Sequence, residues 1–287
     1  INSLPVPRHG VAYERAIAFI LGTLDDKIEL NQKMNQTLEE ITKTLFKSWF
    51  VDFDPVRAKT EGRSTNLPPE ISDLFPDELV ESEIGEIPKG WEYVPMSYLT
   101  DVMTRGIAPI YTEDKTYPVI NQKCIRNSDI NFELCKFTKY KKNIEQKFLK
   151  PFDILVNSMG VGTLGRVSLF VNYETNVTVD GLITVVRGIT ESESLFLYQH
   201  LSSRESEIIN LSTGTTGQTS LKLKDLGELK VVRPSQALLN IFADTTRDMH
   251  IKKRTNTIEN STLTAIRDTL LPKLISGELR IPDEQRF

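Results

Sequence analysis

The chain has 287 residues, of which 39% are hydrophobic and 26% are charged, and its formal net charge is −4. This length can hold one or two domains with a sizeable core, and the composition is typical of an ordinary globular protein. No apolar run approaches a membrane span and no signal peptide is visible, so we expect a cytoplasmic protein without a membrane partner. The three histidines are scattered, and Cys124 and Cys135 lack a further pair, which predicts reduced thiols and no metal site.

The first predicted element is a long helix. Alternating steps of four and three residues from Ile17 to Trp49 give an apolar seam with coiled-coil spacing, interrupted in its middle by Asn31 and Asn35. The pattern predicts a helix from about Tyr13 to Phe50, about 55 Å long at 1.5 Å per residue. Pro55 should prevent its continuation.

An acidic stretch follows this helix. Between Glu61 and Glu86 there are eight acids against one base, and residues 61–90 also contain several prolines. We interpret these residues as a linker with one short helix. Residues 91–233 are rich in strand-forming residues, with a helical segment at 194–212, and they predict a mixed α/β globular domain.

Two local patterns inside that domain suggest binding. Residues 136–150 contain six lysines and a single acidic residue, Glu145. Such a run is ordinarily a solvated face, but local charge, more than net charge, governs phosphate binding. Residues 157–166, NSMGVGTLGR, contain the G-x-G-x-x-G pattern of nucleotide-binding loops. Because more strand, and no helix, is predicted after this loop, we expect no nucleotide cofactor.

The last element repeats the first. Residues 31–46 align with residues 256–271 at a constant offset of 225, with seven identities in sixteen positions. Buried polar seam positions fix register or partner choice at a cost in stability. We predict that the two helices pack antiparallel along this seam, whereas the alternative is that each packs separately on a globular core. Pro272 should bend or end the second helix before Ser276-Gly277 turns the chain. The predicted seam residues are Asn31, Asn35, Leu38, Asn256, Asn260 and Leu263.

Five segments carry a family resemblance. LDDKIELNQKMNQTLEEITKTLFKSWFVDFDPVRAK (24–59) and LLPKLISGELRIP (270–282) resemble the central and distal conserved regions of DNA-specificity (S) subunits of type I restriction-modification systems. GWEYVPMSYLTDVMTRG (90–106), FDILVNSMGVGTLGRV (152–167) and STGTTGQTSLKLKDLGELKVVRP (212–234) resemble the start, middle and end of a target recognition domain. The resemblance covers essentially the whole chain. It implies an α+β fold: a mixed α/β recognition domain flanked by two long helices that form an antiparallel coiled coil.

The resemblance also implies a division into parts. Leu4 and Val6 match Leu229 and Val231 at the same offset of 225, as expected for the end of a missing first recognition domain. Family members usually carry two such domains, so the chain is either truncated or a half subunit that would form a homodimer. The start at Ile1 without methionine favours truncation or processing. The parts are residues 1–10, the end of the missing domain; 11–60, the central conserved helix; 61–90, the acidic linker; 91–234, the recognition domain; and 235–287, the distal conserved helix.

The implied function is DNA recognition without catalysis. The chain would read one half of a bipartite target in double-stranded DNA and bind methyltransferase (modification) subunits and motor-nuclease (restriction) subunits, with no cofactor or metal. The sequence is consistent with a non-catalytic subunit. Its nearest candidates, NLPPE (66–70) and DFDPV (52–56), do not match an amino-methyltransferase motif, and it has no phosphate-binding loop of the kind found in motor ATPases. The alternative function is a coiled-coil adaptor without DNA readout.

The candidate DNA contacts lie in two glycine-containing loops and a third segment. Glycine lets the backbone approach a partner closely, and neighbouring polar side chains can bind phosphates or base edges. Gln can read adenine and Arg can read guanine. The alternative is that the loop from Gly160 to Gly165 only closes a hairpin. The candidates are Gln122, Lys123, Asn157, Ser158, Thr163, Arg166, Thr215, Thr216, Gln218 and Lys222.

Overall fold

The computed structural model describes residues 10–160, 162–172, 175–212 and 219–282. The chain forms two compact units. The first combines the residues up to Ile41 with those from Met249 onward, and the second comprises Thr42–Asp248. The two long helices, α1 (Val11–Phe50) and α7 (Gln236–Ser276), contribute residues to both units.

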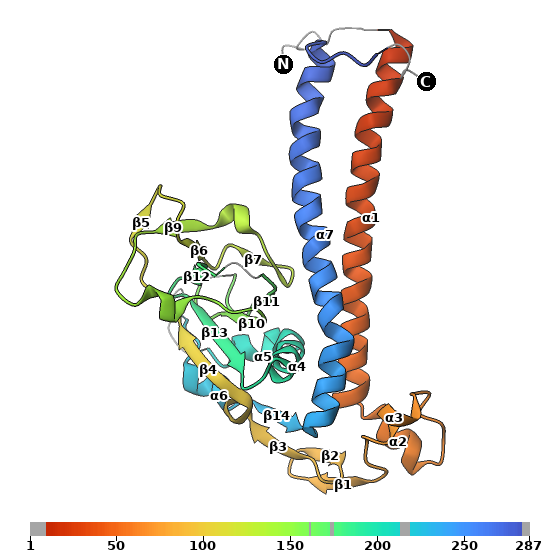
Figure 1. Ribbon diagram of the computed structural model, residues 1–287. Coiled ribbons are helices and arrows are strands. Elements are labelled where there is room, and N and C mark those ends of the chain that lie inside the picture. Colours follow the sequence, from red (N-terminus) through yellow and green to blue (C-terminus); the bar gives the residue numbers. More distant parts are fainter. Residues whose placement is uncertain (1–9, 161, 173–174, 213–218, 283–287) are drawn as a thin grey trace. The chain divides into compact units, whose positions relative to one another are not determined.

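In the first unit, α1 and α7 lie side by side and antiparallel (Figure 1). Tyr13, near the start of α1, donates a hydrogen bond of 2.8 Å to the carbonyl of Leu279, which follows α7. At the other end of this unit, Glu39 forms a 2.7 Å ion pair with Lys253. The predicted antiparallel helix pair is therefore confirmed. The α7 helix continues through Pro272 to Ser276, and Gly277, with φ of +77°, then turns the chain.

The asparagines of the repeat bond across this helix pair. Asn31 and Asn256 are almost fully buried. The Nδ2 of Asn31 donates to Oδ1 of Asn260 at 2.9 Å, and the Nδ2 of Asn256 donates to Oδ1 of Asn35 at 2.8 Å. The offset of 225 residues converts one bond into the other, so the repeat in the sequence is also a repeat in the contacts. Leu38 and Leu263 are both half-buried.

The second unit contains a four-stranded antiparallel sheet in the order β11-β10-β13-β4. Every residue of its central strand β10 is buried, and helix α4 (Glu191–Ser202) packs against the sheet. In neighbouring strands, Arg187 and Asp153 form a bidentate ion pair with N–O distances of 2.6 and 2.7 Å. The strand bounds are β4 (Thr100–Arg105), β10 (Asp153–Asn157), β11 (Val167–Phe170) and β13 (Ile183–Gly188).

The remaining strands are short. The second four-stranded sheet has the order β12-β6-β9-β5, with β12 parallel to β6. Its strands are β5 (Tyr111–Thr112), β6 (Pro118–Ile120), β9 (Lys136–Thr138) and β12 (Thr178–Val179). Three two-stranded pairs join β1 (Leu79–Ser82) to β2 (Gly85–Pro88), β3 (Glu92–Pro95) to β14 (Lys230–Arg233), and β7 (Ile125–Arg126) to β8 (Asp129–Ile130). The short helices are α2 (Asp54–Thr60), α3 (Pro69–Ser72), α5 (Glu205–Asn210) and α6 (Leu223–Gly227), and the 3₁₀ turns are η1 (Met96–Leu99), η2 (Phe132–Leu134) and η3 (Ile144–Lys147).

Residues 61–90, interpreted from composition as a linker, carry α3 and the β1–β2 hairpin. Phe75 is buried between Trp49 and Trp91, with ring centroids 5.3 and 6.5 Å away. The Nζ of Lys59 donates to the carbonyl of Phe75 at 2.6 Å. An aromatic core and a partly buried hydrogen bond therefore hold this acidic segment in place within the second unit.

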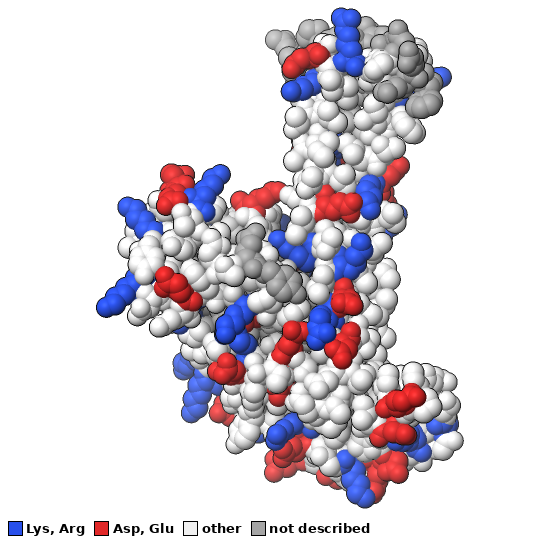
Figure 2. All heavy atoms as spheres, in the orientation of Figure 1, with Lys and Arg blue, Asp and Glu red and all other residues white. Residues whose placement is uncertain are grey.

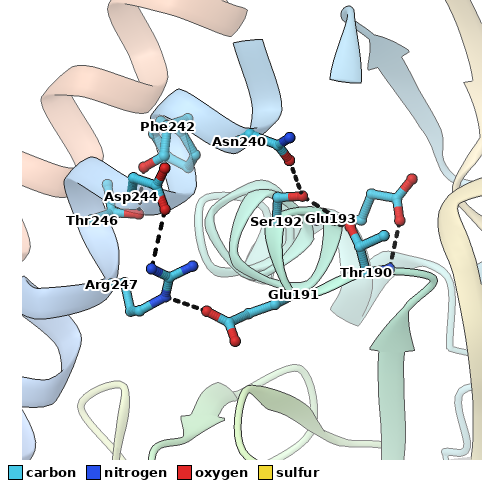
Figure 3. A network of polar contacts seen from close by, with 9 residues as sticks. All are labelled: Thr190, Glu191, Ser192, Glu193, Asn240, Phe242, Asp244, Thr246 and Arg247. Atoms are coloured by element: carbon cyan, nitrogen blue, oxygen red, sulfur yellow. Dashed lines mark hydrogen bonds and ion pairs between the residues drawn. The ribbon is translucent and has the colours of Figure 1, made fainter. Parts of the chain in front are cut away.

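A polar network joins α4 (Glu191–Ser202) to the start of α7 within the second unit (Figure 3). Thr190 and Glu193 form a capping box, which satisfies free N–H groups at the start of α4. The Ser192 hydroxyl donates to Oδ1 of Asn240 at 2.9 Å, and Arg247 pairs with Glu191. The cap explains why α4 begins at Glu191, slightly before the predicted helical segment at 194–212, which the structure divides into α4 and α5.

Candidate nucleic-acid interface

Three of the predicted segments meet at one end of the four-stranded sheet, where β10 ends. The Nδ2 of Asn157, the last residue of β10, donates to the carbonyl of Gln122 at 3.0 Å. Arg166 Nη1 donates to the carbonyl of Ile125 at 3.1 Å. The N–H of Leu221 donates to the carbonyl of Ser158 at 2.9 Å. Residues 121–126, 157–166 and 220–222 are therefore brought together, although they are far apart in the sequence.

The glycine loop connects two antiparallel strands. Because β11 pairs with β10 directly after the loop, no helix opens at Gly165, as predicted. Gly160 has φ of +109°, and a Cβ there would lie 2.6 Å from Oγ1 of Thr163 and 3.0 Å from Nε2 of Gln122. Glycine at 160 thus permits both the backbone turn and the close approach of the Gln122 side chain.

Three candidates act inside the protein. Asn157 and Ser158 are completely buried, and the Ser158 hydroxyl lies 2.6 Å from that of Thr184. The guanidinium of Arg166 donates hydrogen bonds to two backbone carbonyls, that of Ile125 at 3.1 Å and that of Gly162 at 2.8 Å. A buried side chain cannot meet a base edge in this conformation, which corrects the expectation of direct contacts from Asn157 and Ser158. These three residues hold the loops in position.

The other candidates are more accessible. Lys123 and Lys222 are exposed, and Gln122 and Thr163 are half-buried. Within the described part of the chain, Oε1 of Gln122 is buried without a hydrogen-bond partner. Thr215, Thr216 and Gln218 lie outside the described residues.

Arg126, which no sequence pattern singled out, is an exposed cation next to Ile125 on the β7–β8 hairpin. Asn127 and Ser128 form the turn with φ of +53° and +55°, as in the tight turns that match strand twist. The only signal in the sequence was the short polar run that follows Arg126, which does not distinguish a hairpin from a loop.

The lysine run of residues 136–150 is partly engaged within the protein. The Nζ of Lys147 donates to Oγ1 of Thr104 at 2.7 Å, and the Nζ of Lys136 lies 4.7 Å from the centre of the Tyr111 ring. Acidic and basic side chains are interspersed over the face shown in Figure 2. The lysines with exposed side chains are Lys136, Lys139, Lys142 and Lys150.

Two further features bear on the kind of site. Among the described residues, no three His, Cys, Asp or Glu side chains are grouped so that they could hold a metal ion. None of the described helices combines the length and the apolar composition needed to cross a membrane.

Comparison with known proteins identifies the family. No protein-family model matches the chain. It is 30% identical over 317 residues to the type I restriction enzyme HindI specificity subunit of Haemophilus influenzae, covering 93% of this chain and 67% of that protein. It is 28% identical over 292 residues to the MjaIX specificity subunit of Methanocaldococcus jannaschii, covering 99% of this chain and 62% of that protein. The chain belongs to the type I restriction enzyme specificity subunits.

A solved structure shows the same fold. The S subunit of a type I restriction-modification system from M. genitalium superposes with a TM-score of 0.58 at 16% identity. The match covers 91% of this chain and 60% of that chain. The α+β fold class, with its mixed helix and sheet unit and two long helices, is thereby confirmed.

Proposed function

We propose that this chain reads one half of a bipartite target in double-stranded DNA and holds the methyltransferase and restriction subunits of a type I complex. Residues 91–234 are the recognition domain in this proposal, and the paired helices are the scaffold. Membership of the specificity-subunit family supports it, and the observation that carries the site is the convergence of residues 121–126, 157–166 and 220–222 at one end of the sheet.

The proposed surface separates two kinds of contact. Lys123, Arg126 and Lys222 are exposed cations suited to phosphates, which position a protein on DNA without reading its sequence. Gln122 and Thr163 lie beside the glycine loop, and a glutamine can bond adenine with its amide oxygen and amide nitrogen. For Gln122 this contact requires a side-chain rotation that exposes the buried Oε1. Thr215, Thr216 and Gln218 stay candidates, because the chain that follows them returns to the same site at Leu221.

We propose that the chain supplies no catalysis, cofactor or metal, and that it acts in the cytoplasm beside the DNA. Methylation and cleavage would belong to the modification and restriction subunits. The alternative, a coiled-coil adaptor without DNA readout, is disfavoured because both relatives are named as specificity subunits. An adaptor role also does not account for the polar loops that meet at the end of the sheet.

Duplex binding tests this function. The chain, assembled with its methyltransferase subunit, should select one half-site from a random duplex library and lose affinity steeply as salt rises. Lys222→Ala should weaken binding to selected and random duplexes alike. Gln122→Ala should cost about 1–3 kcal/mol on the selected duplex and little on random DNA.

The matched control is Lys33→Ala, which removes the same charge from α1 in the first unit and should leave both affinities unchanged. Salt-independent binding, or a library that yields no common sequence, would favour the adaptor. An equal loss on both duplexes for Gln122→Ala would make that residue a phosphate contact.

A further inference from the structure

The two cysteines of the chain lie in contact with each other. Cys124 precedes β7, and Cys135 follows η2. Their sulfur atoms are 3.9 Å apart, and neither forms a disulfide. Cys124 is completely buried, whereas Cys135 is half-buried and is the more exposed of the two. Their separation of eleven residues gave no sign of this contact, which arises because the β7–β8 hairpin folds the segment back.

One side-chain and one backbone hydrogen bond hold the two segments together, and a further backbone bond fixes the turn before Cys135. The Nδ2 of Asn121 donates to the carbonyl of Leu134 at 3.0 Å, which ties the residues before Cys124 to those before Cys135. The N–H of Asn131 donates to the carbonyl of Cys124 at 2.8 Å. The N–H of Cys135 donates to the carbonyl of Phe132 at 3.1 Å. The sulfur contact is therefore a product of the fold, not of two free side chains that happen to meet.

We propose that Cys124 and Cys135 are a reversible dithiol–disulfide couple that small disulfides, such as oxidised glutathione, oxidise. A disulfide bond is about 2.05 Å long, so the two sulfur atoms must approach by roughly 1.9 Å from their present 3.9 Å. Rotation about the Cα–Cβ bonds of the two side chains would have to supply that movement. The couple goes beyond DNA recognition and does not depend on it, although Cys124 shares its segment with Gln122 and Lys123.

The exchange has two steps. The more exposed Cys135 thiolate attacks oxidised glutathione, forms a mixed disulfide and releases one glutathione thiolate. The Cys124 thiolate then attacks the Cys135 sulfur and releases the second. Two protein thiols lose two electrons and two protons, and one oxidised glutathione becomes two reduced molecules. In the reduced pair, the hydrogen bond from Cys135 lowers the pKa of the Cys124 thiol, against the effect of burial. This bond is lost once Cys135 carries glutathione, and the second attack then depends on the closeness of the two sulfur atoms.

Thiol trapping tests the couple directly, because the chain has only these two cysteines. The full chain is equilibrated in glutathione buffers of increasing oxidised fraction, quenched with acid, alkylated and weighed by mass spectrometry. Both alkylation sites should disappear together, with a linked 124–135 peptide in monomeric protein. The same chain unfolded in guanidinium chloride should need a roughly tenfold more oxidising buffer, because folding raises the effective concentration of the pair.

Single variants provide the matched controls. Cys124→Ser should accumulate a glutathione mixed disulfide at Cys135, while Cys135→Ser should leave the buried Cys124 unmodified. The proposal is overturned if native protein keeps two alkylatable thiols across the series. It is equally overturned if the native chain accumulates glutathione on Cys135, or if folded and unfolded chains oxidise at the same buffer ratio.

Discussion

Arg187 and Asp153 show how a single pair of residues holds the central sheet. The Asp153 carboxylate is completely buried, and the Arg187 side chain is 20% exposed. The hydrogen bond to Asp153 raises the pKa of Arg187, which therefore keeps its charge. Arg187→Ala should lower the free energy of unfolding of the second unit by about 3–5 kcal/mol, because it leaves a buried carboxylate unpaired. Urea unfolding followed by tryptophan fluorescence measures this loss, since Trp49 and Trp91 both lie in that unit.

The control removes both charges. Asp153→Asn with Arg187→Met leaves no buried charge and keeps an acceptor for the N–H of Lys150, which Asp153 binds at 2.8 Å. This double variant should be more stable than Arg187→Ala alone. A double variant that is as unstable as the single one would show that the charge pair is not the reason for the loss.

His200 makes the stability of the second unit depend on pH. Burial, with a smaller contribution from the charge of Arg204, lowers the pKa of His200 to about 3. An unfolded histidine has a pKa of about 6.5, so below that pH the unfolded chain binds a proton that the folded chain does not. The free energy of unfolding should therefore fall as the pH drops below about 6.5, by up to about 1.4 kcal/mol per pH unit for this residue.

The His200→Gln variant isolates this effect, because glutamine does not titrate. Its urea midpoints, followed by tryptophan fluorescence, should change less steeply than those of the parent between about pH 6.5 and about pH 5. The comparison is between slopes, so a constant loss of stability in the variant does not matter. Parallel slopes would show that His200 takes up a proton in the folded chain.

For single residues, the sequence predicted segments that the structure brings together, but not the direction of each side chain. Alternation of polar and apolar residues reveals which side of a strand is exposed only when one side faces water. All five residues of β10 are buried, so nothing in the local pattern indicated that Asn157 and Ser158 are hidden. The accessible Lys123 and Lys222 follow the usual preference of lysine for the surface.

Among the elements, the asparagine-interrupted seam was the most predictable, because the same spacing occurs in two helices. Oδ1 of Asn31 and Oδ1 of Asn256 are buried and lack a hydrogen-bond partner among the described residues. Replacing Asn31, Asn35, Asn256 and Asn260 by Leu should therefore raise the melting temperature of the helix pair, while loosening its register. Circular dichroism measures the first effect. Spin labels at the exposed Leu30 and Ile258 measure the second, as a broader distance distribution.

A matched variant separates polarity from packing. Leu38→Asn with Leu263→Asn adds two polar groups to the same seam and should lower the melting temperature. If the four-leucine variant melts at a lower temperature than the parent, the asparagines stabilise the helix pair, contrary to this interpretation.

The segment 61–90 shows where composition misleads at this scale. Acidic residues and prolines are typical of linkers, yet one buried aromatic residue, Phe75, anchors the segment between Trp49 and Trp91. Contacts between residues that are distant in the sequence produce no periodic pattern in the local sequence from which they could be predicted. For the same reason, the two-residue strands β5 and β12, which exist only through their partners, could not be predicted.

For the whole molecule, we predict that the helices set the gap between two half-sites. Each helical residue adds about 1.5 Å, against about 3.4 Å per base pair of DNA. Four residues inserted near Asn31 add roughly 6 Å and just over one helical turn, so the seam is nearly preserved. In a two-domain subunit, or in a dimer of this chain, the gap between half-sites should lengthen by about one or two base pairs. Sequencing of methylated sites measures the gap, and an unchanged gap with activity retained would show that another element sets it.

The most direct test of the proposed function exchanges the recognition domain. Residues 91–234 are replaced by the corresponding domain of another specificity subunit whose half-site is known, and parent and exchanged chains are each produced with the methyltransferase subunit. In a two-domain subunit, mapping of methylated sites should show that one half-site changes to that of the donor, while the gap and the other half-site stay the same. In a dimer of this chain, both half-sites should change together and the gap should stay the same. A methylated sequence that is identical for the two chains would contradict the assignment of DNA recognition to residues 91–234.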